Sequence, residues 1–386
     1  MYSYTIAGQP NKKRLQANLT ATAYPYPVYT ANLDASYTYD TEGKMTSVSY
    51  PNAGPTYTYS FDSLSRPTGL TDQNNYAAVS GAQYAPSNQM LSLNYFGVTE
   101  SRTYNTLMQL TNITIPGQLN LTYNYQTGTN NGKISSQSDA ISGETVTYAY
   151  DSLNRLLSAS GSGWNQSFGY DGFGNLVSKT GSNSPPLSIS VSATTNQIQG
   201  VFGLSYDNNG NELHGGVAYD AENRLLSAPG VQYAYDSRNK RVWKGTLSGG
   251  VVTAQEVYFY GVDGQKLGTY SLTLNGTQLT ASTTQTAVFF GGKRVAVNGA
   301  AFVPDRLGSN TAGKYFPYGE DRGADRERSG EVRHVHSGFS DGAGLCRSAL
   351  LLQSVRQVHD GGPVPGYGDL AQRSKESTKL ESLFIR

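Results

Sequence analysis

The side chains most capable of chemistry gather near the end of the chain. Residues 324–386 hold three of the four histidines, His334, His336 and His359, and the single cysteine, Cys346. A His-x-His pair on one strand face can share a metal ion, but the spacing here places no third or fourth ligand. Cys346 would act as a nucleophile only beside a base, and the sequence identifies neither a base nor an orienting group. We therefore name no catalytic residue, no metal ligand and no cofactor.

Aspartates are the other candidates for acid–base chemistry, and they recur through the chain within one repeated sequence motif. The best copies read YDSLNRLLSASG from Tyr150, YDGFGNLVSKTG from Tyr170 and YDAENRLLSAPG from Tyr219. Each aspartate has a local role in its own copy, so no carboxylate pair for acid–base work can be nominated. Phosphate-cradling, HExxH and GxSxG signatures do not stand in a supporting context either.

Repetition of this motif predicts the architecture. Tyr150 and Tyr170 stand 20 residues apart, a period typical of stacked supersecondary units rather than of one globular core. Weaker copies begin at Tyr39, Phe61, Tyr125, Tyr206 and Tyr235.

Each copy has the pattern of a β-hairpin. Tyr148 and Tyr150 project to one face of an extended segment and Ala149 to the other, because side chains alternate along a strand. Asp151 can accept hydrogen bonds from the amides of its own turn. Asn154, which other copies replace with Gly, suits a position of positive φ. Because an isolated hairpin is marginal in water, neighbouring copies must stack to bury their tyrosines.

We assign the repeated positions a structural role rather than a catalytic one. They are Tyr39, Asp40, Tyr150, Asp151, Asn154, Arg155, Tyr170, Asp171, Gly174, Asn175, Tyr206, Asp207, Tyr219, Asp220, Asn223, Arg224, Tyr235 and Asp236. We expect consecutive antiparallel hairpins from about Tyr4 to about Gly319, each contacting mainly its sequence neighbours. Residues 181–200 and 271–284, where the motif is weak, should form longer strands or loops at the sheet edge.

Composition agrees with an all-β chain. The 386 residues include 29 Tyr and 44 Gly, and no long helical stripe is present. A net charge of +1 with 15% charged residues gives no basic footprint, which argues against nucleic acid as a partner. No apolar stretch approaches the length of a spanning helix, and the start of the chain shows no secretory signal.

The repeats resemble the YD-repeat (RHS) family, whose copies run roughly YDxxGNRL and close with a glycine. Beyond the repeats, VYFYGVDGQKLGTYSL from Val257, VFFGGKRVA from Val288, DRLGS from Asp305 and YFPYGEDRG from Tyr315 look like the start of the family's core. The residues of this core-like motif are Asp305, Gly308, Pro317, Tyr318 and Gly319.

The resemblance implies both a fold and a partner. In this family the repeats form a curved, spiralling β-sheet that closes into a hollow shell around a polypeptide cargo. In bacteria the cargo is typically a C-terminal toxin, cut free by an aspartate-dependent self-cleavage at the end of the core. No position here matches those aspartates. The family also suggests secretion or the cell envelope, and it is associated with carbohydrate contact at cell surfaces.

The family pattern stops near Gly323. Family members continue with a segment like TGLDYARYY, then GRF and an Asp-Pro, and residues 324–386 contain none of these. Back-translation of residues 324–367 with allowed codons, read one nucleotide later, yields GLDYADQRYY followed by GRFMTGDP. We therefore predict a change of reading frame near Gly323. We expect the tail to be poorly ordered, except that residues 348–358 could form a short amphipathic helix.

We divide the chain into a YD-repeat array (residues 1–256), the start of a core-like region (257–323) and a non-family tail (324–386). The leading hypothesis is a structural scaffold, a truncated shell of the kind that encloses a toxin. One alternative is a cell-surface carbohydrate-binding module, since tyrosine rings can stack on sugars. Another is a hydrolase or toxin acting through the histidine-rich tail. Exposed strand edges at both ends of a partial array also predict poor solubility.

Overall fold

The computed structural model describes residues 1–20, 28–311, 313–322 and 384–385. Within these residues the chain is all-β, with antiparallel strands joined as consecutive hairpins, and this confirms the predicted fold class. The one helical element of the described residues is a short 3₁₀ turn, η1 (His214–Gly216). None of them forms a helix long and apolar enough to cross a membrane.

The predictions for the C-terminal tail fall almost entirely outside the described residues. They concern its order, the helix at 348–358, and the side chains of His334, His336, His359 and Cys346. Phe384–Ile385 is described, as strand β29, which pairs antiparallel with β2 (Pro10–Thr20).

The described residues divide into two compact units. The first contains the described residues of 1–80, 203–300 and 384–385, and the second contains those of 81–202 and 301–322. The boundary placed at residue 256 from the sequence motifs falls inside one continuous strand, β24 (Val251–Tyr260). The compact units therefore divide the chain at other places than the motifs do.

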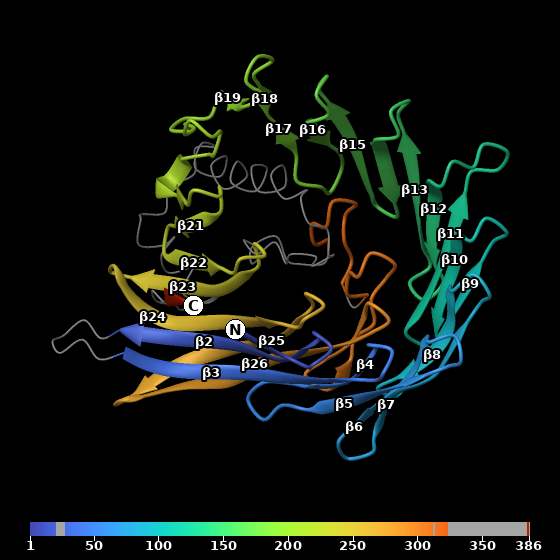
Figure 1. Ribbon diagram of the computed structural model, residues 1–386. Helices are drawn as coiled ribbons and strands as arrows, with labels where there is room; N and C mark the ends of the chain where they lie inside the picture. Colours follow the sequence, from blue (N-terminus) through green and yellow to red (C-terminus); the bar gives the residue numbers. More distant parts are fainter. Residues whose placement is uncertain (21–27, 312, 323–383, 386) are drawn as a thin grey trace. The chain divides into compact units, whose positions relative to one another are not determined.

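The first unit consists of an early and a late group of strands, each running in chain order (Figure 1). The early strands are β1 (Tyr2–Tyr4), β2, β3 (Val28–Tyr39), β4 (Met45–Ser49), β5 (Thr56–Phe61), β6 (Pro67–Asp72) and the first part of β7 (Ala77–Tyr84). The late strands are β20 (Ala218–Tyr219), β21 (Leu225–Ala228), β22 (Val231–Tyr235), β23 (Arg241–Ser248), β24, β25 (Lys266–Asn275), β26 (Gln278–Phe290), β27 (Lys293–Val297) and β28 (Ala300–Ala301).

The second unit continues with shorter hairpins, drawn from light blue to green in Figure 1. Its strands are β8 (Met90–Tyr95), β9 (Val98–Tyr104), β10 (Leu110–Ile115), β11 (Leu119–Tyr125), β12 (Ile134–Asp139), β13 (Glu144–Tyr150), β14 (Leu156–Gly161), β15 (Trp164–Tyr170), β16 (Leu176–Thr180), β17 (Leu187–Ser188), β18 (Ser190–Val191) and β19 (Ile198–Gln199). Residues 302–322 contain turns and isolated bridges instead of strands.

Alternation along the strand explains the hairpins, as β13 illustrates. Val146 is buried and Tyr148 and Tyr150 are half-buried, whereas Ala149 is exposed, as the sequence predicted. The strand pairs with β14, and the register shifts between Ala149 and Tyr150. A register shift at the same point, just before the motif's aromatic residue, recurs in β3, β5, β11, β15, β22 and β24. Such bulges raise the local twist of a strand pair, and the sequence did not reveal them.

The copy at Tyr206 departs from the hairpin expectation. Its turn is present, but Tyr206 and Glu212 form only an isolated bridge, and this hairpin has no return strand. The return segment runs into Gly215 and Gly216, both at positive φ, within η1. An extended return strand is interrupted there because consecutive left-handed residues turn the backbone away from a ladder.

The segments with a weak motif form long strands or loops, as predicted, but residues 271–284 do not all lie at a sheet edge, because Leu272 pairs with Gln255 on one side and Ala281 on the other. Residues 271–284 belong to the long hairpin of β25 and β26. Residues 181–200 contain only the two-residue strands β17, β18 and β19 within loops.

Packing in the first unit also joins strands that are far apart in the sequence. The buried Tyr50 hydroxyl donates to the Ala287 carbonyl at 2.9 Å, and the side-chain amide of Asn52 donates to Thr283 Oγ1 at 3.1 Å. The Lys13 ammonium lies 5.7 Å from the centre of the Phe259 ring. The expectation of contacts mainly between sequence neighbours is therefore incomplete, because apolar strand faces left over from hairpin formation must be covered.

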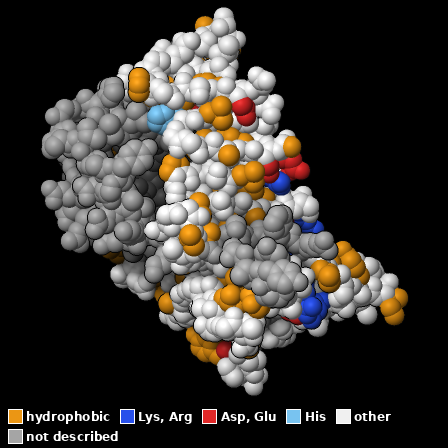
Figure 2. All heavy atoms as spheres, turned by 90° about the vertical axis from the view of Figure 1, so that its left-hand side faces the viewer, with side chains coloured by type: hydrophobic (Ala, Val, Ile, Leu, Met, Phe, Trp, Pro, Cys, Tyr) orange, Lys and Arg blue, Asp and Glu red, His pale blue; other side chains and the backbone are white. Residues whose placement is uncertain are grey.

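The surface carries little charge, in line with the composition. On the face shown in Figure 2, most visible side chains are uncharged, and the charged ones lie in small separate groups. Some exposed hydrophobic side chains occupy the turn position two residues after the motif's aspartate, as Leu64, Leu153 and Phe173 do.

Candidate functional site

The repeated aspartates close the hairpin turns. Asp151 Oδ1 accepts hydrogen bonds from the amides of Leu153 and Arg155, both at 2.9 Å, and Asn154 has φ of 66°. The same two acceptor bonds are made by Asp40, Asp62, Asp171, Asp207, Asp220 and Asp236. The third residue after the aspartate has positive φ in each turn, and it is Gly43, Ser65, Gly174, Gly210, Asn223 or Asn239.

The carboxylates of Asp171 and Asp207 are held in their ionised form. Asn175 donates a side-chain hydrogen bond to Asp171, and this bond, opposed by burial and aided by turn amides, lowers the pKa of Asp171. The Asn211 side chain, followed by its backbone amide, likewise lowers the pKa of Asp207. A carboxylate with its acceptor sites occupied by its own turn is a poor general acid or base.

Arginine and tyrosine side chains connect each hairpin to the next. Arg155 Nε donates to Asp151 Oδ2 at 2.7 Å, and its guanidinium lies 4.6 Å from the centre of the Tyr170 ring. The Tyr170 hydroxyl donates back to the Leu156 carbonyl at 2.8 Å. Arg224 and Tyr235 repeat this arrangement in the first unit, at 5.2 Å from the ring centre. The motif therefore fixes both the turn and the stacking of neighbouring hairpins.

The core-like motif uses the same turn chemistry. Asp305 accepts hydrogen bonds from the amides of Leu307 and Ser309, and Gly308 has φ of 84°. In the second turn the Gly319 amide donates to the Phe316 carbonyl at 2.8 Å, with Gly319 at φ of 88°. Pro317 lies at the first central position of this turn, where its restricted φ is favourable.

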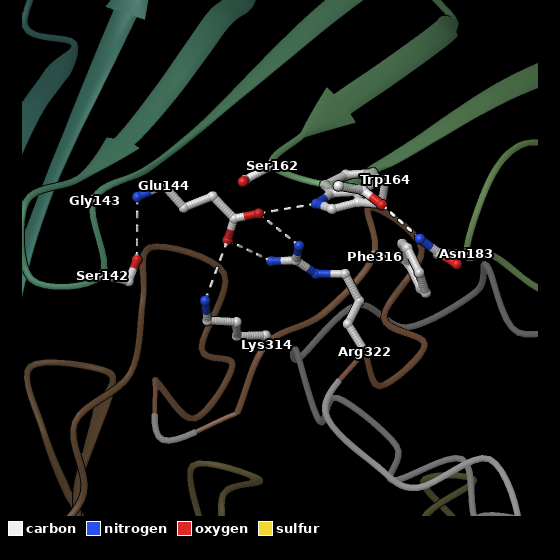
Figure 3. Close-up of a pocket in the computed structure, with 10 residues that line it drawn as sticks. Ser142, Gly143, Glu144, Ser162, Trp164, Asn183, Lys314, Phe316 and Arg322 are labelled. Atoms are coloured by element: carbon white, nitrogen blue, oxygen red, sulfur yellow. Dashed lines mark hydrogen bonds and ion pairs between the residues drawn. The ribbon is translucent and has the colours of Figure 1, made fainter.

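An ion-paired cluster in the second unit joins residues 314–322 to the repeat strands (Figure 3). Arg322 donates to both oxygens of Glu144, at 2.7 and 2.8 Å, and the Trp164 indole donates to Glu144 Oε1 at 2.9 Å. The Arg322 guanidinium also lies 4.7 Å from the centre of the Trp164 ring. Lys314 Nζ is 3.8 Å from Glu144 Oε2. We call residues 314–322 the anchor segment.

Aromatic contacts and a second ion pair extend this attachment. Phe316 meets Trp164 edge to face, with ring centres 5.2 Å apart, and Tyr318 meets Phe168 in the same way at 5.0 Å. The Tyr318 and Tyr170 hydroxyls are hydrogen-bonded to each other. Lys179, which is buried, pairs with Glu320. We call the side chains of Glu144, Trp164, Phe168, Tyr170 and Lys179 the anchor face.

A glycine makes room for the cluster. A Cβ atom on Gly161 would lie 2.7 Å from Glu144 Oε1 and would also clash with the Trp164 ring. Gly161 does not have positive φ, so space rather than backbone conformation requires glycine here. The glycine that closes this repeat in the sequence therefore lies directly beneath the anchor.

A cavity of about 380 Å³ lies beside the cluster, with Ser142, Ser162, Asn183 and Lys314 along its wall. The Arg322 hydrogen bond, opposed by burial and aided by Trp164, lowers the pKa of Glu144 from 4.5 to about 2. Glu144 is therefore ionised and engaged at neutral pH. No group of three or more potential metal ligands occurs in the part of the chain that the structure describes. The geometry fits attachment of a segment better than catalysis.

Sequence reasoning found the turn residues but not the anchor. Glu144 and Trp164 lie in strands where their neighbours follow the ordinary alternation, and Glu144 and Arg322 are 178 residues apart. The sequence offered one signal. In YFPYGEDRG, the charged residues Glu320 and Arg322 come directly after Pro317, Tyr318 and Gly319 of the core-like motif.

Comparisons with known proteins support the fold. No family model matches the chain, and no curated protein matches it. The chain is similar in structure to a chain of the Photorhabdus luminescens Tc holotoxin pore, with a TM-score of 0.55, 16% identity and 83% of this chain covered. A crystal structure of TcdB2-TccC3 without its hypervariable C-terminal region gives a TM-score of 0.59, again with 16% identity and 83% of this chain covered. In both cases the likeness spans only 20% of the other chain, and at this identity it shows a shared fold.

Proposed function

We propose that this chain is part of a YD-repeat (RHS-type) shell, a structural scaffold that encloses a polypeptide cargo, and that it performs no catalysis of its own. The observation that carries the proposal is the combination of consecutive Tyr-Asp hairpins with a core-like segment that returns to dock on them through Glu144 and Arg322. A wall that must enclose another polypeptide needs strands tied to one another and a closing segment tied to the wall. The similarity in fold to chains of Tc toxin assemblies supports this reading.

Protease protection tests the proposal. The gene should be expressed with the reading frame continued into the core motif and the polypeptide beyond it, since the present chain spans about a fifth of the chains it resembles. We expect the downstream polypeptide to resist added protease until the repeats are unfolded by denaturant. If it is cut as fast inside the fusion as alone, the enclosure proposal fails.

The carbohydrate-binding alternative is less favoured by the described tyrosines. Sugar stacking needs a free aromatic face, but Arg155 lies over the Tyr170 ring and Arg224 lies over the Tyr235 ring. Their hydroxyls are also used, as donors to the Leu156 and Leu225 carbonyls. The repeat motif thus uses its aromatic residues to hold neighbouring hairpins together.

A further inference from the structure

We propose that the anchor face is a recognition surface for a β-turn peptide, and that the anchor segment which fills it can be supplied by a second copy of this chain. The proposal concerns contacts within the second unit alone, so it does not depend on whether the repeats enclose a cargo. It predicts a reciprocal exchange of residues 314–322 between two copies when the contact within each copy is weakened and the contact between copies is matched.

The anchor segment obtains its shape from its own backbone. The Phe316 amide donates to the Glu320 carbonyl and the Arg322 amide to the Lys314 carbonyl, each at 2.8 Å. Tyr315 and Asp321 form an antiparallel bridge across the same turn. Because these hydrogen bonds close within nine residues, the segment can present the same turn wherever it comes from.

Side chains from β13, β15 and β16 hold the segment to the anchor face. Arg322 pairs with Glu144 on β13, Glu320 pairs with Lys179 on β16, and Phe316 and Tyr318 contact aromatic rings on β15. Phe316 and Lys179 are only 4% and 5% exposed. Charged pairs and aromatic anchors at the centre of a buried contact are the features that dominate recognition between separate proteins.

Charges of opposite sign are matched in a fixed order between the anchor segment and the anchor face. The segment carries a carboxylate at Glu320 and a guanidinium at Arg322, and the face carries the opposite charges at Lys179 and Glu144. Reversing either partner places like charges together, and this gives the contact a specificity that apolar packing lacks. A tethered segment has an effective concentration of about millimolar, so its own copy wins unless that contact is weakened.

Two charge-reversed full-length chains test the exchange. In Glu144→Arg and in Arg322→Glu the segment meets a like charge within its own copy. Mixed in equal amounts, the two chains offer matched charges in both directions. By size-exclusion chromatography with light scattering of the soluble fraction, we expect a dimer in the mixture and no dimer from either variant alone, from the unchanged chain or from the double variant Glu144→Arg/Arg322→Glu. A mixture that stays monomeric while the double variant regains the stability of the unchanged chain overturns the proposal.

A peptide experiment keeps the test decisive if the charge-reversed chains fold poorly. Arg322→Gln introduces no like charges, and circular dichroism will report whether this full-length chain is folded. A fluorescent peptide of sequence KYFPYGEDR should bind it saturably, and a peptide ending in Glu instead of Arg should bind at least about tenfold more weakly. Equal binding of the two peptides, or none of either to the folded chain, would show that the face recognises no separate segment.

Discussion

At the scale of single residues, burial and partners divide the carboxylates into two kinds. Asp171, Asp207 and Glu144 have donors arranged around them, and their pKa values are lowered. Burial instead raises the pKa of Asp305 and of Asp263, although each accepts turn amides. A carboxyl group whose pKa is raised on folding makes the folded state less stable as pH rises. A carboxyl group whose pKa is lowered on folding makes the folded state more stable as pH rises.

The anchor gives a pH prediction with a defined sign. The pKa of Glu144 falls from 4.5 to about 2 on folding, so its stabilisation is present above about pH 4.5 and is lost as pH falls toward about 2. Replacing Glu144 with Gln should lower the free energy of unfolding by about 1–3 kcal/mol near neutral pH and by much less near pH 2. Urea unfolding followed by tryptophan fluorescence measures both values.

Because of a second carboxylate, Asp34, the quantity to measure is the difference in free energy of unfolding between the unchanged chain and Glu144→Gln, not the pH dependence of one chain alone. The pKa of Asp34 is also lowered to about 2, chiefly by the Arg14 hydrogen bond, so Asp34 titrates in the same window. It is present in both chains and cancels in the difference. A difference between the unchanged chain and Glu144→Gln that does not vary with pH would contradict the ion pair.

Gly161 gives a steric prediction at the same scale. Gly161→Ala should destabilise the chain by about 1–3 kcal/mol, because the added methyl group must displace Glu144 or Trp164. Gly172→Ala is the matched control, since nothing lies within 4 Å of a Cβ atom there, and it should change stability by less than about 0.5 kcal/mol. Equal thermal midpoints for the two variants would show that Glu144 and Trp164 can move to admit the methyl group without loss of stability.

At the scale of the element, one hairpin supplies its own turn and half of each junction with its neighbours. Asp151 closes the turn, Arg155 reaches the next tyrosine, and the Tyr150 hydroxyl donates back to the Ile134 carbonyl at 3.0 Å. Local residues therefore specify the hairpin and its nearest stacking partners. The anchor face differs because it exists only when the successive strands from β13 to β16 have paired, and nothing in any one hairpin encodes the segment that covers it.

The turn itself can be tested at Asn154. Its φ of 66° lies in the left-handed region, which a β-carbon disfavours and which asparagine tolerates. Asn154→Ala should cost about 1–2 kcal/mol, whereas Asn154→Gly, which reproduces the residue of other copies, should be nearly neutral. Denaturant midpoints of the two variants should therefore separate, and coinciding midpoints would contradict the assigned turn.

At the scale of the whole molecule, the chain passes from the first unit to the second and back before it enters the second unit again at residue 301. This last passage brings the core-like motif onto strands more than 140 residues earlier in the chain. The anchor is thus a long-range closure in a fold otherwise built from local hairpins, and its formation must await the strands that make the face.

The predicted change of reading frame after Gly323 affects the whole molecule and can be tested directly. The nucleotide sequence after the codon of Gly323 should, one base later, encode GLDYADQRYY and then GRFMTGDP. Sequencing the gene and its transcript measures this directly. A next frame without GLDY and GRF would mean that residues 324–386 are a genuine divergent tail.

The sequence by itself determined the local part of this protein. Tyr-Asp repetition, alternation and the Asn or Gly turn position predicted the all-β hairpins, because those features act within about a dozen residues. Only the tertiary structure showed the bulge before motif residues such as Tyr150, the bond from Tyr50 to Ala287 and the anchor of Arg322 on Glu144. The physical reason is that an ion pair across 178 residues and the covering of an apolar strand face depend on which strands become neighbours, and no local pattern records that.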